Sequence, residues 1–213
     1  MIKIIHPDTI MKELVILIES VGKRNFLKSP EYQKEMEQFI ACFFAYAIRK
    51  FSEKEYFIHQ VPEPDSSDFR LSTFNNETVE TRALKTALIQ LVELPQILTR
   101  ERDIINKIYE IISAKYGKYS DENKLMLLIF SNFEGHQSYV DNIRQFVKEK
   151  QREGRYNMVW LLRFIGVNEI KGFNCEVNQL WPNSSVINFW LTDEFNRGIV
   201  YNNSYIKKYL IKS

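Results

Sequence analysis

The second half of the chain alternates short apolar runs with an amphipathic helix, and this pattern constrains the fold most strongly. The apolar runs are KLMLLIFSN at 124–132 and NMVWLLRFI at 157–165. Between them, the polar stretch 137–152 carries Val140, Ile143 and Val147 at helical spacing. A continuous apolar run of this length predicts a strand buried on both faces. Strands that alternate with helices predict an α/β fold with a mixed central sheet flanked by helices.

The first fifty residues predict two helices. The first covers 8–22, with Asp8 and Thr9 as capping residues and Gly22 at its end. The second covers 30–51 and begins at Ser29-Pro30, where serine caps the helix and proline occupies its first turn. An apolar stripe on this second helix marks it as a central core helix, and its members are Phe39, Cys42, Phe43, Tyr46 and Ala47.

Strand patterns follow these helices. Segment 55–61 (EYFIHQV) is rich in aromatic and β-branched residues, and segment 68–73 (DFRLST) alternates polar with apolar residues. Both patterns predict strands. Segment 78–94 has apolar residues at helical spacing, but its last part, 87–94 (ALIQLVEL), also fits a buried strand. Periodicity alone does not decide between the two. Further along the chain, the patterns predict a helix over 96–116 and strands over 173–181 and 186–191.

We therefore expect a single α/β domain over residues 1–213. Its parts are an N-terminal helical extension (1–29), a core (30–181) and a C-terminal appendage (182–213). No apolar run approaches the roughly 18 residues that a membrane span needs. The N-terminus lacks the cleavage site of a signal peptide, so we expect a cytoplasmic protein that does not enter the membrane.

Composition excludes several functional classes. Cys42 and Cys175 lie far apart and outside any CxxC pair, which argues against a structural zinc site. The sequence contains neither GxGxxG nor GxxxxGK[ST], so nucleotide binding through a glycine-rich loop is excluded. The formal net charge is +2, so the surface as a whole is not a strongly basic one that would bind nucleic acid.

One polar constellation points to chemistry. It combines Asp65 and Asp68 in the turn PDSSDF with Gln90 and Glu93 in IQLVEL. Hard cations such as Mg²⁺ bind carboxylate oxygens, usually one or two, with water and phosphate completing the shell. If 87–94 is a strand, Asp68 and Glu93 can lie side by side and hold such an ion. The other reading is that Asp65 and Asp68 only accept backbone N–H bonds in a turn.

Over residues 30–181 the chain resembles the PD-(D/E)xK nuclease superfamily, which has the restriction-endonuclease-like fold. The similarity lies in a helix before the strands, the Pro64-Asp65 turn leading into a strand, and the acidic residue in Val92-Glu93-Leu94. The resemblance implies a Mg²⁺-dependent nuclease that acts on DNA and often dimerises. It assigns Asp65, Asp68 and Glu93 to the metal and gives Gln90 the role of positioning water. In some relatives of that superfamily, a carboxylate from the N-terminal helix reaches the metal. If this chain is similar to them, Glu35 or Glu37 takes that role.

The motif departs from the family at one position. Glu-x-Lys places a lysine two residues after the acid, and this sequence has Pro95 there. A literal Glu-x-Lys occurs at 169–171, about a hundred residues from Asp68. The missing lysine favours a second hypothesis, a non-catalytic module on the same fold that binds nucleic acid or protein. A third hypothesis, a mostly helical regulatory or immunity protein, applies if 78–94 is helical.

Overall fold

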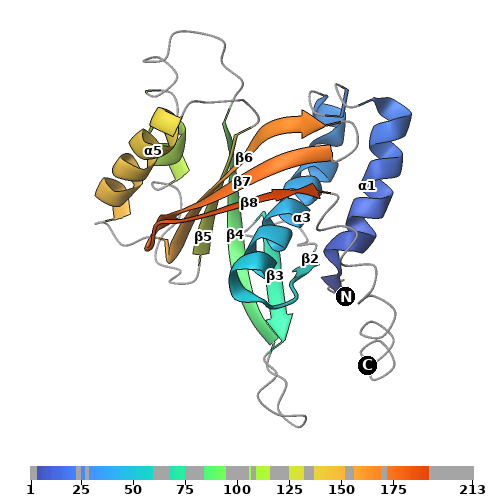
Figure 1. Ribbon diagram of the computed structural model, residues 1–213, viewed down its shortest axis with the longest axis horizontal. Helices are drawn as coiled ribbons and strands as arrows, with labels where there is room; N and C mark the ends of the chain where they lie inside the picture. The colour runs from blue at the N-terminus through green and yellow to red at the C-terminus, as the bar shows by residue number, and fades with distance from the viewer. Residues whose placement is uncertain are drawn as a thin grey trace.

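The computed structural model contains a mixed eight-stranded sheet with helices on both faces (Figure 1). It describes residues 4–22, 25–26, 29–59, 68–74, 84–94, 106, 109–115, 125–131, 137–151, 156–168 and 172–191. The predicted α/β class with a mixed central sheet is confirmed. No helix in these ranges is long and apolar enough to cross a membrane.

The helices and strands alternate along the chain. The helices are α1 (Pro7–Val21), the 3₁₀ turn η1 (Pro30–Tyr32), α3 (Gln33–Ser52) and α5 (Gln137–Lys150). Residues 109–115 are also helical. The strands are β1 (Ile4–Ile5), β2 (Phe57–His59), β3 (Phe69–Phe74), β4 (Leu84–Leu94), β5 (Leu125–Ser131), β6 (Met158–Asn168), β7 (Gly172–Trp181) and β8 (Ser185–Trp190).

Each strand of the sheet lies beside the next one in the chain. The central pairs β4–β5 and β5–β6 are parallel, and all other neighbouring pairs are antiparallel. Parallel neighbours need a crossover connection, and the helical segment 109–115 and α5 lie in these two connections. Because such crossovers are right-handed, both helices lie on the same face of the sheet.

Two apolar cores lie on opposite faces of the sheet. One contains α1 and α3 together with the side chains of alternate strand residues such as Leu91, Phe130 and Phe164. The other core contains α5, the segment 109–115 and the strand residues that alternate with those of the first core, such as Val92 and Ile129. Strands buried on both faces need continuous apolar runs, and this is why β5 and β6 confirm the strands predicted over 124–132 and 157–165.

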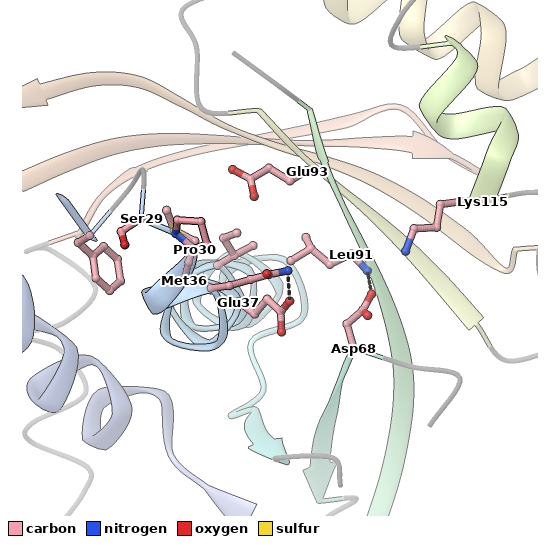
Figure 2. A pocket seen from close by; sticks show the side chains of 11 residues that line it. Ser29, Pro30, Met36, Glu37, Asp68, Leu91, Glu93 and Lys115 are labelled. Atoms are coloured by element: carbon pink, nitrogen blue, oxygen red, sulfur yellow. Dashed lines mark hydrogen bonds between the residues drawn. The ribbon is translucent and has the colours of Figure 1, made fainter. Parts of the chain in front are cut away.

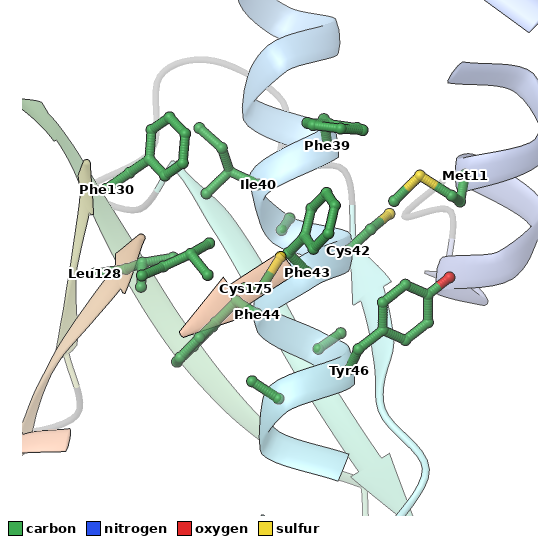
Figure 3. Close-up of a cluster of buried hydrophobic side chains, with 14 of the residues drawn as sticks. Met11, Phe39, Ile40, Cys42, Phe43, Phe44, Tyr46, Leu128, Phe130 and Cys175 are labelled. Atoms are coloured by element: carbon green, nitrogen blue, oxygen red, sulfur yellow. The ribbon is translucent and has the colours of Figure 1, made fainter. Parts of the chain in front are cut away.

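The middle of helix α3 is buried on all sides rather than along a stripe. Every residue from Phe39 to Ala47 is at most 1% exposed. The reason is that α3 lies between the sheet on one side and α1 on the other, as Figure 3 shows with Phe130 on the sheet and Met11 on α1. The stripe predicted for this helix was therefore too narrow. Cys42 and Cys175 are both buried and free.

The start of α1 differs from the prediction. The capping group is His6, whose Nδ1 accepts the Asp8 N–H at 3.2 Å, while Asp8 itself is fully buried. Its carboxylate accepts a hydrogen bond from the Tyr46 hydroxyl at 2.8 Å. Asp8 thus joins α1 to α3 instead of capping a helix. Gly22 ends α1 as predicted, with a φ of 83° that favours glycine.

The strand β4 resolves the ambiguous segment. Residues 84–94 form a strand, and the third hypothesis, a mostly helical protein, is wrong. The N-terminal extension is not purely helical, because β1 pairs with β2 and joins the sheet. The C-terminal part 182–213 contributes β8 to the opposite edge, and its residues from 192 on lie outside the described ranges. Of the predicted helix 96–116, only 106 and 109–115 are described, and both are helical.

Candidate active site

Asp68 lies where the ladder between β3 and β4 ends. The last antiparallel pair at this end is Phe69 with Ile89, and the Asp68 N–H still donates to the Ile89 carbonyl at 2.9 Å. The Asp68 carboxylate then replaces the next backbone acceptor, because its Oδ2 accepts the Leu91 N–H at 2.5 Å. Among the described residues, β4 continues beyond this point to Leu94. The carboxylate is thereby fixed at a strand end, where Asp68 itself is exposed.

The alternation of side chains along β4 decides which residues share the space beside Asp68. Leu91 and Glu93 face the α3 side, where both line a cavity together with Asp68. Gln90 and Val92 face the opposite side because successive strand residues point to opposite faces. Asp68 and Glu93 are therefore brought to one cavity, as the strand interpretation of 87–94 expected.

Gln90 does not belong to this cavity. It is 1% exposed, and its Oε1 accepts a hydrogen bond from the Tyr156 hydroxyl at 2.7 Å. Tyr156 belongs to the core on the α5 face of the sheet. The structure does not bring Gln90 to Asp68 and Glu93, where it was expected to position a water, because a strand residue next to Leu91 projects to the other face.

Two further charged side chains reach the cavity from other elements. Glu37 comes from the second turn of α3, and Lys115 comes from the helical segment on the opposite face of the sheet. Figure 2 shows Glu37 and Lys115 approaching the Asp68–Leu91 pair from opposite sides of β4. The cavity has a volume of about 480 Å³, and its lining is Phe26, Ser29, Pro30, Gln33, Met36, Glu37, Ile40, Asp68, Leu91, Glu93 and Lys115.

The charges in the cavity influence one another. Burial raises the pKa of the Glu37 carboxyl, and the neighbouring Asp68 charge raises it further. A hydrogen bond from Gln33 and the charges of Lys34 and Lys115 oppose this rise. Burial raises the pKa of Glu93. The charge of Asp68 thus acts on Glu37, whereas burial is the cause that the described residues give for the raised pKa of Glu93.

The donor set has the chemistry that a hard divalent cation requires. Carboxylate oxygens from Glu37 and Asp68 repel each other, and a cation between them would remove that repulsion. Within the described ranges, no three acidic, histidine or cysteine side chains are grouped closely enough to hold a metal ion on their own. Mg²⁺ is usually held by one or two carboxylates and keeps several waters, so the carboxylates of Glu37 and Asp68 are ligands of the type that this ion takes in proteins.

The remaining sequence candidates have different outcomes. Asp65 and the literal Glu-x-Lys at 169–171 lie outside the described residues. Glu37 was one of two helix carboxylates considered, and the structure brings it rather than Glu35 to the cavity. Lys115 was missed, since no motif or spacing connects it to Asp68 along the chain. Its helical register and the sheet topology together bring it to the cavity.

Comparisons with protein-family models, with curated proteins and with solved structures found no match for this chain.

Proposed function

We propose that this cavity hydrolyses phosphodiester bonds of nucleic acid with the help of a divalent cation such as Mg²⁺. The observation that carries the proposal is the convergence of Glu37, Asp68 and Lys115 on one cavity from three separate elements. Glu93 adds a further carboxylate at the rim. Carboxylates beside a lysine provide groups that hold a cation and a group that neutralises phosphate charge.

The carboxylates have distinct roles in this proposal. Glu37 and Asp68 would hold the cation, which when bound neutralises charge on the phosphate and lowers the pKa of a bound water. Glu93, with its raised pKa, accepts a proton from the attacking water. The water oxygen forms a bond to phosphorus, the bond from phosphorus to the leaving sugar oxygen breaks, and that oxygen takes up a proton from solvent.

Lys115 provides the positive charge that the strand lacks. At the family position two residues after Glu93 stands Pro95, which has no charge to offer. Lys115 reaches the same cavity from the helical segment 109–115, and its positive charge acts to lower the pKa of Glu37. In the proposed reaction its ammonium group stabilises the negative charge that develops on the non-bridging phosphate oxygens.

The order of elements supports a restriction-endonuclease-like core within the larger sheet. Helix α3 precedes the antiparallel strands β2, β3 and β4, and a crossover that includes the helical segment 109–115 then leads to the parallel strand β5. This is the order on which the sequence resemblance rests. Asp68, immediately before β3, and Glu93, near the end of β4, correspond to the acidic positions of that resemblance.

The test is cleavage of plasmid and single-stranded substrates with Mg²⁺, with Mn²⁺ and with EDTA. Asp68→Asn is the informative variant, because an asparagine oxygen can still accept the Leu91 N–H while the negative charge is lost. We expect cation-dependent cleavage by the native chain and its loss in Asp68→Asn. Cleavage that persists in this variant or in EDTA would refute the proposal.

A non-catalytic binding module is the second candidate, favoured by one observation. Leu91, an apolar residue, occupies the cavity-facing position of β4 nearest to Asp68, and it is 9% exposed. This position offers no ligand to a cation. Binding of nucleic acid without any cation-dependent turnover by pure folded protein would support this second function over the first.

A further inference from the structure

We propose that Gln33 positions the Glu37 carboxylate so that this carboxylate can hold the divalent cation. Gln33 is then a positioning residue, because it acts on the cation through Glu37 and not by direct contact. The inference rests on the cation site of the proposed function, and it adds to that site a residue that no sequence motif marks.

Gln33 and Glu37 lie one helical turn apart on α3. Gln33 is the first residue of this helix, and side chains four residues apart on a helix are neighbours on one face. The Gln33 Nε2 donates a hydrogen bond to Glu37 Oε1 at 3.5 Å, which is the dashed line that ends on Glu37 in Figure 2. Both side chains line the cavity. One face of α3 therefore supplies a carboxylate of the site together with a donor that holds it.

The hydrogen bond engages one of the two carboxylate oxygens of Glu37. Oε1 accepts the amide N–H, and Oε2 can then bind a cation that Asp68 also holds. Carboxylates that bind metals are commonly held by such outer partners, which fix their orientation. Burial and the Asp68 charge raise the pKa of Glu37, and the bond from Gln33 opposes this rise. Because a carboxyl must be deprotonated to bind a metal, the bond favours the form that binds.

The amide of Gln33 suits this role because it donates a hydrogen bond without carrying a charge. A lysine or arginine at the same position would neutralise Glu37 and so compete with the cation. Gln33 is exposed and lies outside both apolar cores, so its side chain contributes little to the packing of α3. Its contact with Glu37 therefore serves the cavity rather than the core.

A matched pair on another helix provides a control. On α5, Gln145 Nε2 donates to Glu149 Oε1 at 2.9 Å, again across four residues, and both side chains are exposed. Neither of them lines the cavity. The bond on α3 is longer, and hydrogen bonds in active sites often tighten only when the reacting complex forms. We therefore expect the bond from Gln33, and not the one from Gln145, to affect cation binding.

The binding test measures the affinity of the full chain for Mn²⁺ by electron paramagnetic resonance, with Mg²⁺ as competitor. Gln33→Met keeps a long, unbranched side chain but has no N–H to donate. We expect Gln33→Met to weaken Mn²⁺ binding about tenfold and Gln145→Met to leave it unchanged. Native affinity in Gln33→Met, or no binding of Mn²⁺ by the native chain, would overturn the inference. Circular dichroism checks that the variants fold, and Gln33→Ala replaces Gln33→Met if the latter does not.

A double-variant cycle tests whether Gln33 acts through Glu37. On a Glu37→Gln background the carboxylate that Gln33 holds is gone, so adding Gln33→Met should leave the residual Mn²⁺ affinity unchanged. A further loss of affinity in the double variant would show that Gln33 acts on the cation by another route, and would contradict its role as a positioning residue for Glu37.

Cleavage assays separate this inference from the proposed function. At limiting Mg²⁺ we expect Gln33→Met to cleave about tenfold more slowly than the native chain, and at saturating Mg²⁺ to approach the native rate. An equal loss at both concentrations would overturn the inference. Cation-dependent cleavage with native Mn²⁺ affinity in Gln33→Met would also overturn it, and would leave the proposed function standing. Weakened Mn²⁺ binding in Gln33→Met, with no cleavage of any substrate by the native chain, would support the inference and refute the proposed function.

Discussion

The carboxylate of Asp68 accepts the backbone N–H of Leu91 at 2.5 Å, so the side chain of one strand completes the hydrogen-bond ladder of its neighbour. The same carboxylate lines the cavity and raises the pKa of Glu37. Asp68 thus has a structural bond through one oxygen and an electrostatic effect on the site. These two contributions can be separated by choosing substitutions that remove one and keep the other.

The first prediction compares Asp68→Asn with Asp68→Ala. Asparagine retains an acceptor for the Leu91 N–H, whereas alanine removes it. We expect the alanine variant to lose about 1 kcal/mol of unfolding free energy and the asparagine variant to lose less. Both should lose cation-dependent cleavage. Urea unfolding and a cleavage assay on the same preparations measure the two effects, and an active asparagine variant would contradict the assignment.

The second prediction concerns pH. The pKa of Glu37 is raised above its ordinary value of 4.5 in the folded chain, so folding favours the protonated carboxyl. Stability should therefore fall as the pH rises from about 4.5 through the raised pKa of the folded state. Glu37→Gln removes this term, and its unfolding free energy relative to the native chain should increase over that pH interval. Urea unfolding at several pH values tests this, and a difference independent of pH would refute it.

The influence of Asp68 on Glu37 can be measured separately. Removing a neighbouring negative charge makes ionisation of a carboxyl easier. We expect the pKa of Glu37 to be lower in Asp68→Asn than in the native chain. Carboxyl ¹³C NMR titration of both proteins makes the comparison, and an unchanged pKa would show that the two carboxylates do not interact.

The fourth prediction tests Lys115. Its side chain lines the cavity, while its backbone carbonyl accepts the Tyr156 hydroxyl at 3.4 Å, a contact that substitution of the side chain leaves in place. We expect Lys115→Met to reduce cleavage by about 10²–10³-fold, the usual loss for removing one group that stabilises developing charge. Lys115→Arg keeps the charge and should retain a larger part of the activity. Full activity of Lys115→Met would exclude its role.

The fifth prediction gives Gln90 a structural role only. Its Oε1 accepts the Tyr156 hydroxyl on the side of the sheet opposite the cavity, and both residues are buried. Gln90→Leu should lower the unfolding free energy by about 1–3 kcal/mol, because the hydroxyl loses its acceptor at 2.7 Å while the Lys115 carbonyl lies farther away, at 3.4 Å. The double variant with Tyr156→Phe should lose less than the sum of the single losses. Cleavage rates of the folded Gln90→Leu variant should match the native chain, and a selective loss of cleavage would contradict this account.

Much of the fold was predictable because its signals are local. Continuous apolar runs identified β5 and β6, and the alternation in 68–73 identified β3. The strand β4 was ambiguous, since a strand buried on both faces and a buried helix can share one apolar pattern. Pairing with β3 and β5 decides that this segment is a strand. That pairing depends on residues outside the segment, so the segment's own pattern does not contain it.

The candidate site was predictable only in part, for a related reason. Asp68 and Glu93 follow from strand ends, where polar residues interrupt apolar runs. Gln90 was grouped with Glu93, but side chains three residues apart on a strand project to opposite faces, so the two cannot share one side of β4. Lys115 lies on the opposite side of the sheet from Glu37, and only the three-dimensional arrangement brings the two to one cavity.

The most direct test of the central claim is single-turnover cleavage of a labelled single-stranded oligonucleotide with Mg²⁺ by the native chain and three folded variants. The account predicts cleavage by the native chain and by Gln90→Leu, and severe loss in Asp68→Asn and Lys115→Met. It also predicts no cleavage in EDTA. A native chain that is pure, folded and inactive with Mg²⁺ would contradict the claim, as would an Asp68→Asn variant as active as the native chain.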